Sequence, residues 1–329
     1  MPALDPLISV IFLNYNHGRF VGVALRALLA QTYRDLEILF VDDGSTDGSR
    51  KIVEQIASTE RRIRPVYFDQ NQGIWAGLSD ALSRARGDLL YWAASDDYLT
   101  NDRFFEHAVF ALKENPSAGG CYGLSQVISF ETDQNQETRG KGVTHGFIEP
   151  KLFFKEFLRG NIFVPGNTAV IRRELLLEVG GYDAELGPLA DFYVNNALGS
   201  KYGLIFLNEV VGCARISDTN QTYSSNSDLQ TALRRWGRFE KKMRAMACSY
   251  DEQEEDWKKW QHEQASQLAL RFSRVQRSVT RIKEIFGDIL PVTAQVWLTT
   301  IWRHTARKGL LILTAMTPAY RRARRGFRH

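Results

Sequence analysis

Two pairs of adjacent aspartates are the residues whose type and spacing point most directly to chemistry. Asp42 and Asp43 begin the segment DDGSTD, and Asp96 and Asp97 follow a serine in the segment SDD. Like charges that share one crevice repel each other, so they need a cation or hydrogen-bond donors beside them. A hard divalent ion that also bridges substrate phosphates would supply the positive charge. The two pairs therefore favour chemistry on a phosphate-bearing substrate.

Each pair taken alone also has a purely structural interpretation. A DDGS segment is often only a turn in which Ser45 or Thr46 caps the next helix, and Asp96 and Asp97 could cap a helix in the same way. The sequence has no GxGxxG after its first apolar run and no GxxxxGK[ST]. Phosphate is therefore expected to be neutralised by a metal rather than by a glycine-rich loop.

The elements that would position these aspartates alternate along the first third of the chain. Apolar runs predict buried strands at residues 8–13, 37–41, 64–68 and 88–92. Apolar residues at helical spacing predict helices at residues 20–28, 52–57, 74–85 and 104–112. This alternation predicts an α/β fold with a parallel sheet covered on both faces. Ligands bind at the carboxyl ends of such strands, where both aspartate pairs fall.

The next hundred residues mix the two patterns. Short strands are predicted at residues 120–124, 127–130, 168–171, 204–207 and 210–213. Short helices are predicted near residues 152–157 and at 173–179, the second ended by Gly180 and Gly181. Residues 131–142 are polar and contain glycine, which predicts a loop.

The whole set of segments resembles the family 2 glycosyltransferases of the GT-A fold. The resemblance is carried by ISVIFLNYN at 8–16, VDDGSTD at 41–47, NQG at 71–73, RGD at 86–88 and SDD at 95–97. It continues more loosely through RREL at 172–175, GGYD at 180–183 and LAD at 189–191. It implies a Rossmann-like, mostly parallel central sheet flanked by helices. It also implies inverting transfer of a sugar from a nucleotide-diphospho-sugar to a hydroxyl acceptor.

The resemblance implies a donor site built from four residues. Tyr15, beside Asn14, falls where the family stacks the donor's base, and Asp43 matches the carboxylate that reads this base. A carboxylate that accepts a ring N3–H favours a pyrimidine nucleotide. Asp96 matches the first aspartate of the family's DXD-type motif, near the ribose.

The resemblance also implies the catalytic groups. Asp97 matches the ligand that holds Mg²⁺ or Mn²⁺ on the diphosphate, and Asp191 matches the catalytic base that takes the acceptor's proton. Two departures stand out. Position 190 is alanine where the family has a glutamate, and residues 213–220 lack the histidine that often helps to hold the metal. Arg215, in that stretch, could instead face the diphosphate.

Residues 226–291 predict a helical extension to a glycosyltransferase domain at 1–225. Apolar residues at heptad spacing run from Leu268 to Ile289. This stripe predicts either a helix that packs on the body or a helical hairpin or dimer seam, which would make a homo-oligomer.

Residues 292–329 predict a basic amphipathic tail that associates with an anionic membrane surface. The last 27 residues hold eight arginines and lysines and no acid, whereas the first 302 hold 34 basic and 38 acidic residues. Neither apolar flank reaches the length of a membrane span, and Trp297 and Trp302 suit a helix in the interface. An ordinary docking helix with a solvated basic end is the alternative. Nucleic acid is not expected as a partner, because the tail lacks interleaved aromatic residues.

Composition narrows the setting. Three separated cysteines exclude a disulfide scaffold and favour a reducing compartment, and no signal peptide is evident at the N-terminus. We therefore expect an enzyme on the cytoplasmic face of a membrane that builds cell-surface polysaccharide or lipid-linked glycan on a saccharide or lipid-linked acceptor. The alternative is a catalytically inactive nucleotide-sugar-binding or assembly scaffold.

Overall fold

The computed structural model describes residues 5–129, 135–216, 229–247 and 255–261. The chain divides into two compact units, Met1–Asp251 and Glu252–His329. The first unit holds every predicted site residue and extends past the predicted domain boundary at 225. In the second unit residues 255–261 are helical. The predicted heptad stripe and the basic tail lie outside the described residues.

A ten-stranded sheet forms the centre of the first unit, in the order β3-β2-β1-β4-β9-β6-β10-β5, with β7 beside β6 and β8 beside β10. The strands are β1 (Ile8–Asn14), β2 (Leu36–Asp42), β3 (Ile63–Tyr67), β4 (Leu89–Ala94), β5 (Tyr98–Leu99), β6 (Gly120–Ser129), β7 (Asn135–Arg139), β8 (Gly146–Ile148), β9 (Ala169–Arg172) and β10 (Leu204–Ile216).

Parallel pairing aligns the carboxyl ends of the first strands. β1 pairs in parallel with β2 and β4, so that Ile8 lies opposite both Leu36 and Leu89. β3 continues this parallel set, whereas β9 pairs antiparallel with β4 and with β6. The predicted α/β fold is confirmed, and the antiparallel β9 makes the sheet more mixed than the sequence alternation indicates.

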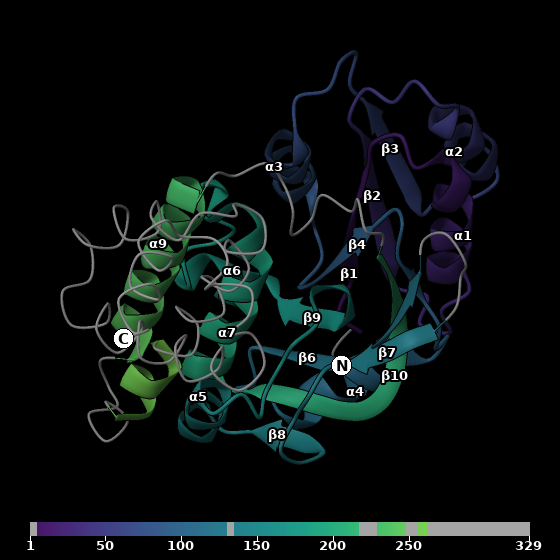
Figure 1. Ribbon diagram of the computed structural model, residues 1–329. Coiled ribbons are helices and arrows are strands. Elements are labelled where there is room, and N and C mark those ends of the chain that lie inside the picture. Colours follow the sequence, from purple (N-terminus) through teal and green to yellow (C-terminus); the bar gives the residue numbers. More distant parts are fainter. Residues whose placement is uncertain (1–4, 130–134, 217–228, 248–254, 262–329) are drawn as a thin grey trace, which may run out of the picture. The chain divides into compact units, whose positions relative to one another are not determined.

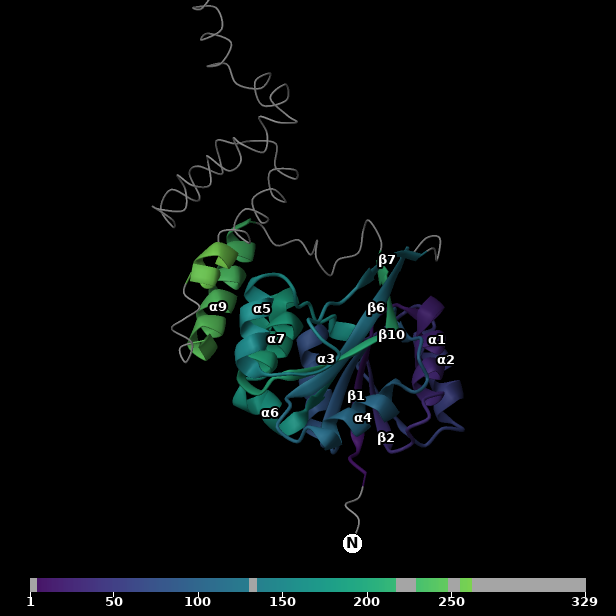
Figure 2. The ribbon, with the colours of Figure 1, turned by 90° about the horizontal axis from the view of Figure 1, so that it is seen from below.

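Helices cover both faces of this sheet (Figure 1). They are α1 (Gly18–Leu29), α2 (Ser49–Ala57), α3 (Ile74–Arg84), α4 (Phe104–Glu114), α5 (Pro150–Leu158), α6 (Arg173–Glu178), α7 (Ala190–Tyr202) and α9 (Leu229–Ala247), with short 3-10 segments η1 (Gly166–Thr168) and η2 (Ala184–Leu189). Figure 2 shows α5, α7 and α9 side by side on one flank, with α1 and α2 on the other.

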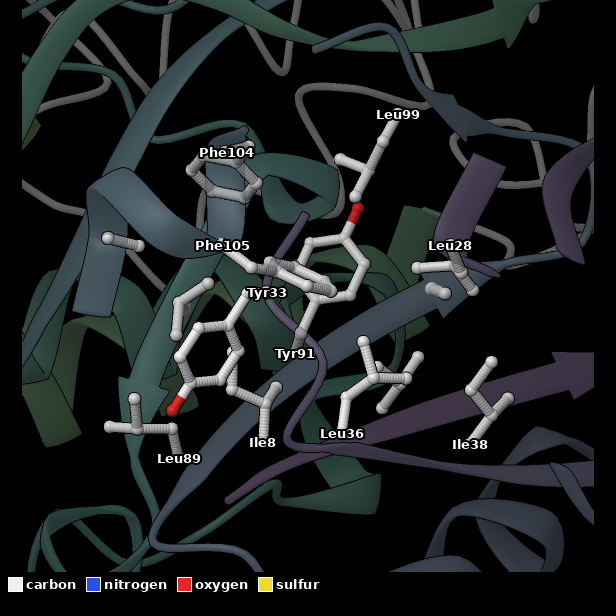
Figure 3. Close-up of a cluster of buried hydrophobic side chains, with 14 of the residues drawn as sticks. Ile8, Leu28, Tyr33, Leu36, Ile38, Leu89, Tyr91, Leu99, Phe104 and Phe105 are labelled. Atoms are coloured by element: carbon white, nitrogen blue, oxygen red, sulfur yellow. The ribbon is translucent and has the colours of Figure 1, made fainter. Parts of the chain in front are cut away.

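A core cluster lies between one face of the sheet and helices α1, α2 and α4. Figure 3 shows part of it, where the Tyr91 and Phe105 rings lie 5.1 Å apart. α3 covers the opposite face, and Gly77 of this helix faces β1 and β2. A Cβ on Gly77 would meet the side chains of Leu13 and Val41 at 3.4 Å.

Three sequence expectations need correction in detail. The two short strands predicted at 120–130 form the single strand β6, and those at 204–213 form the single strand β10, whose register shifts between Phe206 and Gly212. The predicted loop at 131–142 contains the strand β7. Within the residues that the structure describes, no helix has both the length and the apolar character needed to cross a bilayer.

Candidate active site

The carboxyl ends of β1 and β2 are joined by a dense set of hydrogen bonds. Asn14 donates through Nδ2 to Asp42 Oδ1 at 2.7 Å and to Ser45 Oγ at 3.1 Å. Asn16 closes the same link, because its Oδ1 accepts the N–H of Thr46 and its own N–H donates to Ser45 Oγ. The strand-end position predicted for Asn14 is therefore correct, and its side-chain amide holds the two loops together.

Asp43 is fixed at this edge by the segment NQG. The residue is 7% exposed, and its two carboxylate oxygens accept the backbone N–H groups of Gln72 at 2.7 Å and Gly73 at 2.9 Å. Gly44 permits the tight turn: its φ is +72°, and an added Cβ would come within 2.5 Å of the Gln70 backbone. Tyr15 lies nearby in the chain and is 46% exposed.

Arg215 holds the turn that carries Asp96 and Asp97. Its backbone N–H donates to Asp97 Oδ1 at 3.0 Å, and its guanidinium Nη1 donates to the Asp96 carbonyl at 2.6 Å. The guanidinium also lies 4.7 Å from the ring centres of Phe20 and Tyr98. With 8% exposure, Arg215 is a buried brace for this turn.

The two carboxylates of this turn lie close enough for their charges to repel each other. Burial raises the pKa of Asp97 well above its usual range, and the charge of Asp96 adds to the rise, although contacts with Arg215 oppose it. Asp96 Oδ1 lies 3.9 Å from His17 Nδ1, which is hydrogen-bonded to Ser95 Oγ at 2.9 Å. The turn is therefore a place where an added cation would relieve repulsion.

A cavity of about 620 Å³ brings Asp97 and Asp191 together. Leu90, Trp92 and Ala94 line it, and they alternate along β4 with residues of the core cluster, so the cavity lies on the α3 face of the sheet. Two carboxylates that are 94 residues apart in the sequence thus share one concave site. This is the arrangement expected when one group holds a leaving group and another receives a proton.

Asp191 stands in the first turn of α7, where the backbone N–H of Phe192 donates to its Oδ1 at 2.8 Å. Burial raises the pKa of Asp191, and the Phe192 hydrogen bond only partly opposes this shift. A raised pKa improves a carboxylate as a proton acceptor, because it brings the group's basicity closer to neutral pH. Asp191 therefore has the environment of a general base.

Gly166 leaves room for this carboxylate. An added Cβ at position 166 would run into Asp191 Oδ2. We expect Gly166→Ala to lower activity about a hundredfold, because displacing a reacting group by about 1 Å has that effect. Binding of the phosphate-bearing substrate expected beside Asp97 should change little. Initial rates and calorimetric binding test this.

Gly237→Ala is the matched control, because an added methyl there meets no atom within 4 Å among the described residues. If Gly166→Ala keeps a normal rate, the close packing around Asp191 has no catalytic importance.

Comparison with known proteins decides the family. The family described as Glycosyl transferase family 2 matches residues 9–180, just over half of the chain. The chain belongs to this family. An uncharacterized glycosyltransferase of Haemophilus influenzae is 33% identical over 33% of this chain and 44% of its own length. The glycosyltransferase alr2836 of Nostoc sp. is 40% identical over 52% of each chain. The chain thus spans about half the length of these relatives.

Solved structures show a similar fold. The structure of S. aureus TarS 1–349 in complex with UDP-GlcNAc aligns with a TM-score of 0.59 and 14% identity, over 78% of this chain and 80% of that one. At this identity the likeness concerns the fold alone. The chain is therefore a family 2 glycosyltransferase with the GT-A fold.

The residues of this glycosyltransferase suit a divalent ion that is shared with a substrate. Among the described residues, no group of three or more histidines, cysteines and acids could enclose a metal. Magnesium needs no such cage, because it is usually held by one or two carboxylates together with water and substrate phosphates. Asp96 and Asp97 provide adjacent carboxylates that repel each other in its absence. The two carboxylates are therefore of a kind that fits Mg²⁺ or Mn²⁺.

Several residues of the site are absent from the sequence predictions. His17 lies three residues after the end of β1 and could have been found by the same strand-end argument that identified Tyr15. Other residues line the cavity although no local sequence pattern indicates that their segments meet there. They are Trp75, Arg139, Asn167, Tyr182 and Arg235. Tyr182 contacts Trp92 edge to face at 4.8 Å. These aromatic rings make one wall of the cavity apolar.

Proposed function

We propose that this glycosyltransferase transfers a sugar, with inversion, from a nucleotide-diphospho-sugar to a hydroxyl of a saccharide or lipid-linked acceptor. The observation that carries the proposal is the shared cavity of Asp97 and Asp191. Asp97, with Asp96 beside it, would hold Mg²⁺ or Mn²⁺, which when bound neutralises the charge of the diphosphate. Asp191 would take the proton of the acceptor hydroxyl as that oxygen attacks C1 of the sugar.

The donor's base would lie at the edge formed by β1 and β2. Both Asp43 oxygens already accept backbone N–H groups, which fix the carboxylate and leave lone pairs for a further donor such as a pyrimidine N3–H. The exposed Tyr15 ring would stack on the base, with Asn14 holding the loop that carries it. Asp96 would contact the ribose. Arg215 would support the site by bracing the turn that carries Asp96 and Asp97.

The cavity suits a sugar acceptor. Trp75, Trp92 and Tyr182 offer aromatic surface for the apolar faces of a sugar ring, and Asn167 and Asn195 offer amide groups for its hydroxyls. One relative, 33% identical over 110 residues, is named as a putative teichuronic acid biosynthesis glycosyltransferase of Bacillus subtilis. This similarity supports a role in cell-surface polysaccharide synthesis.

A donor screen tests the proposed reaction. UDP-, dTDP- and GDP-sugars are compared by thermal shift and by donor hydrolysis, each with Mg²⁺, with Mn²⁺ and with EDTA. We expect one pyrimidine nucleotide-sugar to stabilise the protein most, and its hydrolysis to need the metal. If no nucleotide-sugar binds, the proposal is wrong.

The basic tail would place this reaction at the cytoplasmic face of a membrane. We expect truncation after about residue 290 to leave a folded enzyme that no longer floats with anionic liposomes. Each basic residue near an anionic surface contributes roughly 1 kcal/mol, and Trp297 and Trp302 would add an apolar contribution that salt does not screen. Full-length protein should therefore be only partly released by high salt.

Circular dichroism melting of the truncated chain is the control. If the tail is instead a helix that docks on the body of the protein, truncation should lower the melting temperature and the full-length protein should not bind liposomes.

A further inference from the structure

Arg235 differs from the other cations of helix α9. It lines the cavity and is half-buried. Its neighbours are engaged elsewhere: Arg234 donates to Thr231 Oγ1, and Arg238 and Lys242 donate to Asp183. Within the part of the chain that the structure describes, no hydrogen bond or ion pair joins the Arg235 guanidinium to another residue. A half-buried charge without a partner is unfavourable, so a ligand is a natural counterpart.

Packing fixes the helix that carries Arg235. The Phe239 ring is stacked on Phe192 of α7 at 5.4 Å and on Trp236 at 5.1 Å. Arg238 and Lys242 form ion pairs with Asp183, next to η2, at 2.7 and 3.1 Å. These contacts hold α9 against η2 and α7. The position of the Arg235 side chain at the cavity is therefore set by a docked helix rather than by a loop.

Gly187 admits the guanidinium to the cavity. It interrupts η2 with φ +54° and ψ −129°, a backbone conformation that favours glycine. An added Cβ would lie 2.7 Å from the central carbon of the Arg235 guanidinium. The cation thus rests on the segment that leads directly into Asp191. This is the acceptor side of the proposed reaction, whereas Asp96 and Asp97 lie on the turn between β4 and β5.

Of the four charged groups that line the cavity among the described residues, only Arg235 is left without a partner once the other three are assigned one. They are two carboxylates, Asp97 and Asp191, and two guanidinium groups, Arg139 and Arg235. In the proposed reaction Asp97 serves the metal and Asp191 receives the acceptor's proton. Arg139 has Glu137 as an ion-pair partner at 2.5 Å. The positive charge of Arg235 remains for a substrate group.

We propose that the acceptor carries an anionic group, a carboxylate or a phosphate. Arg235 binds this group while Asp191 takes the proton of the reacting hydroxyl. This inference rests on the proposed glycosyl transfer and names the chemical class of its acceptor. A guanidinium suits either anion, because its planar N–H groups pair with two oxygens at once. The aromatic wall of the cavity would bind the sugar ring that carries the anion.

Binding of three matched glycosides tests the proposal. The full-length protein is loaded with the nucleoside diphosphate selected by the donor screen, and dissociation constants are measured by ligand-observed NMR. The probes are methyl glucoside, methyl glucuronide and methyl glucoside 6-phosphate. We expect at least one charged glycoside to bind about tenfold more tightly than the neutral one, as a charge-assisted hydrogen bond allows. The carboxylate and phosphate probes distinguish the two kinds of anion.

Substitutions assign this preference to the residue. Arg235→Gln should bring the neutral and charged glycosides to within about twofold of each other, which is the scale of an ordinary neutral contact. Arg235→Lys should keep part of the preference, since it retains the charge. Arg234→Gln, an exposed neighbour on the same helix, should keep all of it. Circular dichroism melting verifies that each variant is folded.

Three results would overturn the proposal: equal binding of all three glycosides, including no binding of any; an unchanged preference in Arg235→Gln; or a loss of nucleotide affinity in that variant, which would place Arg235 on the donor diphosphate. The proposed reaction fails by different measurements. It is wrong if no nucleotide-sugar binds or if substitutions at Asp97 and Asp191 leave transfer intact.

Discussion

Asp97→Ala is expected to abolish metal-dependent sugar transfer and to weaken donor binding. The carboxylate lines the cavity and carries a raised pKa because burial and Asp96 disfavour its charge without a cation. Its removal would leave the charge of the donor diphosphate without the metal that balances it. We expect the transfer rate to fall roughly a hundredfold or more. Even the loss of a residue that only hydrogen-bonds to a metal ligand lowers metal affinity or activity roughly 10- to 100-fold. Initial rates across Mg²⁺ and Mn²⁺ concentrations and donor titration calorimetry measure both effects.

Chelation provides the internal control for this prediction. With EDTA present, wild-type protein and Asp97→Ala should bind the donor equally weakly, because the substitution acts through the metal. Asp88→Ala is the matched variant, since Asp88 is an exposed aspartate just before the same strand, β4. It should behave as wild type. Near-normal metal-dependent turnover by Asp97→Ala would show that the metal is held elsewhere.

The first half of the fold is predictable because its central strands, β1 and β2, are buried on both faces. Continuous apolar runs such as residues 8–13 have few alternatives to a central strand, and amphipathic helices separate them. The site residues that follow these strands are predictable for the same reason. Asp43 and Asp97 are placed by chain topology alone, since parallel strands deliver their carboxyl ends to one edge.

The family motifs, in contrast, do not show which of their residues belong to the site and which only stabilise the fold around it. Arg86, in the RGD segment, binds Glu37 through two guanidinium nitrogens, and Gly87 leaves room for the backbone of Ser9. These residues connect the amino ends of β1, β2 and β4, at the opposite end of the strands from Asp43 and Asp97. Arg215 likewise lies near the carboxyl end of a strand, β10, yet its guanidinium packs on the rings of Phe20 and Tyr98.

Helix α7 shows why the second half is less predictable. Its residues 193–200 are all buried, so its sequence has no polar face and no helical periodicity to recognise. The approach of α9 depends on long-range contacts such as the stack of Phe239 on Phe192. No local pattern predicts that this helix delivers Arg235 to the cavity of Asp191.

Asp191→Asn is expected to lose most of the transfer rate while donor affinity stays nearly intact. The asparagine keeps the size of the side chain and the position of an oxygen beside the Phe192 N–H, but it has lost the basic carboxylate. A general base contributes roughly 10²- to 10⁴-fold, so the loss should fall in that range. Calorimetric titration of the donor into both proteins separates catalysis from binding. A large fall in donor affinity would make Asp191 a donor ligand instead of the base. Glu185→Gln is the control, because it removes an exposed carboxylate from the adjoining segment η2.

The pH dependence of the rate identifies the base more directly. Asp191 can accept a proton only when it is ionised, so transfer should fall as the pH drops through its pKa. Burial raises the pKa of Asp191 above its usual range, and the acidic limb of the profile should therefore lie above the pH at which an exposed aspartate titrates. In Asp191→Asn the residual rate should lose this limb, because the group that titrates there is gone. An acidic limb that persists unchanged in the variant would show that another group titrates there, such as Asp97, whose pKa burial also raises.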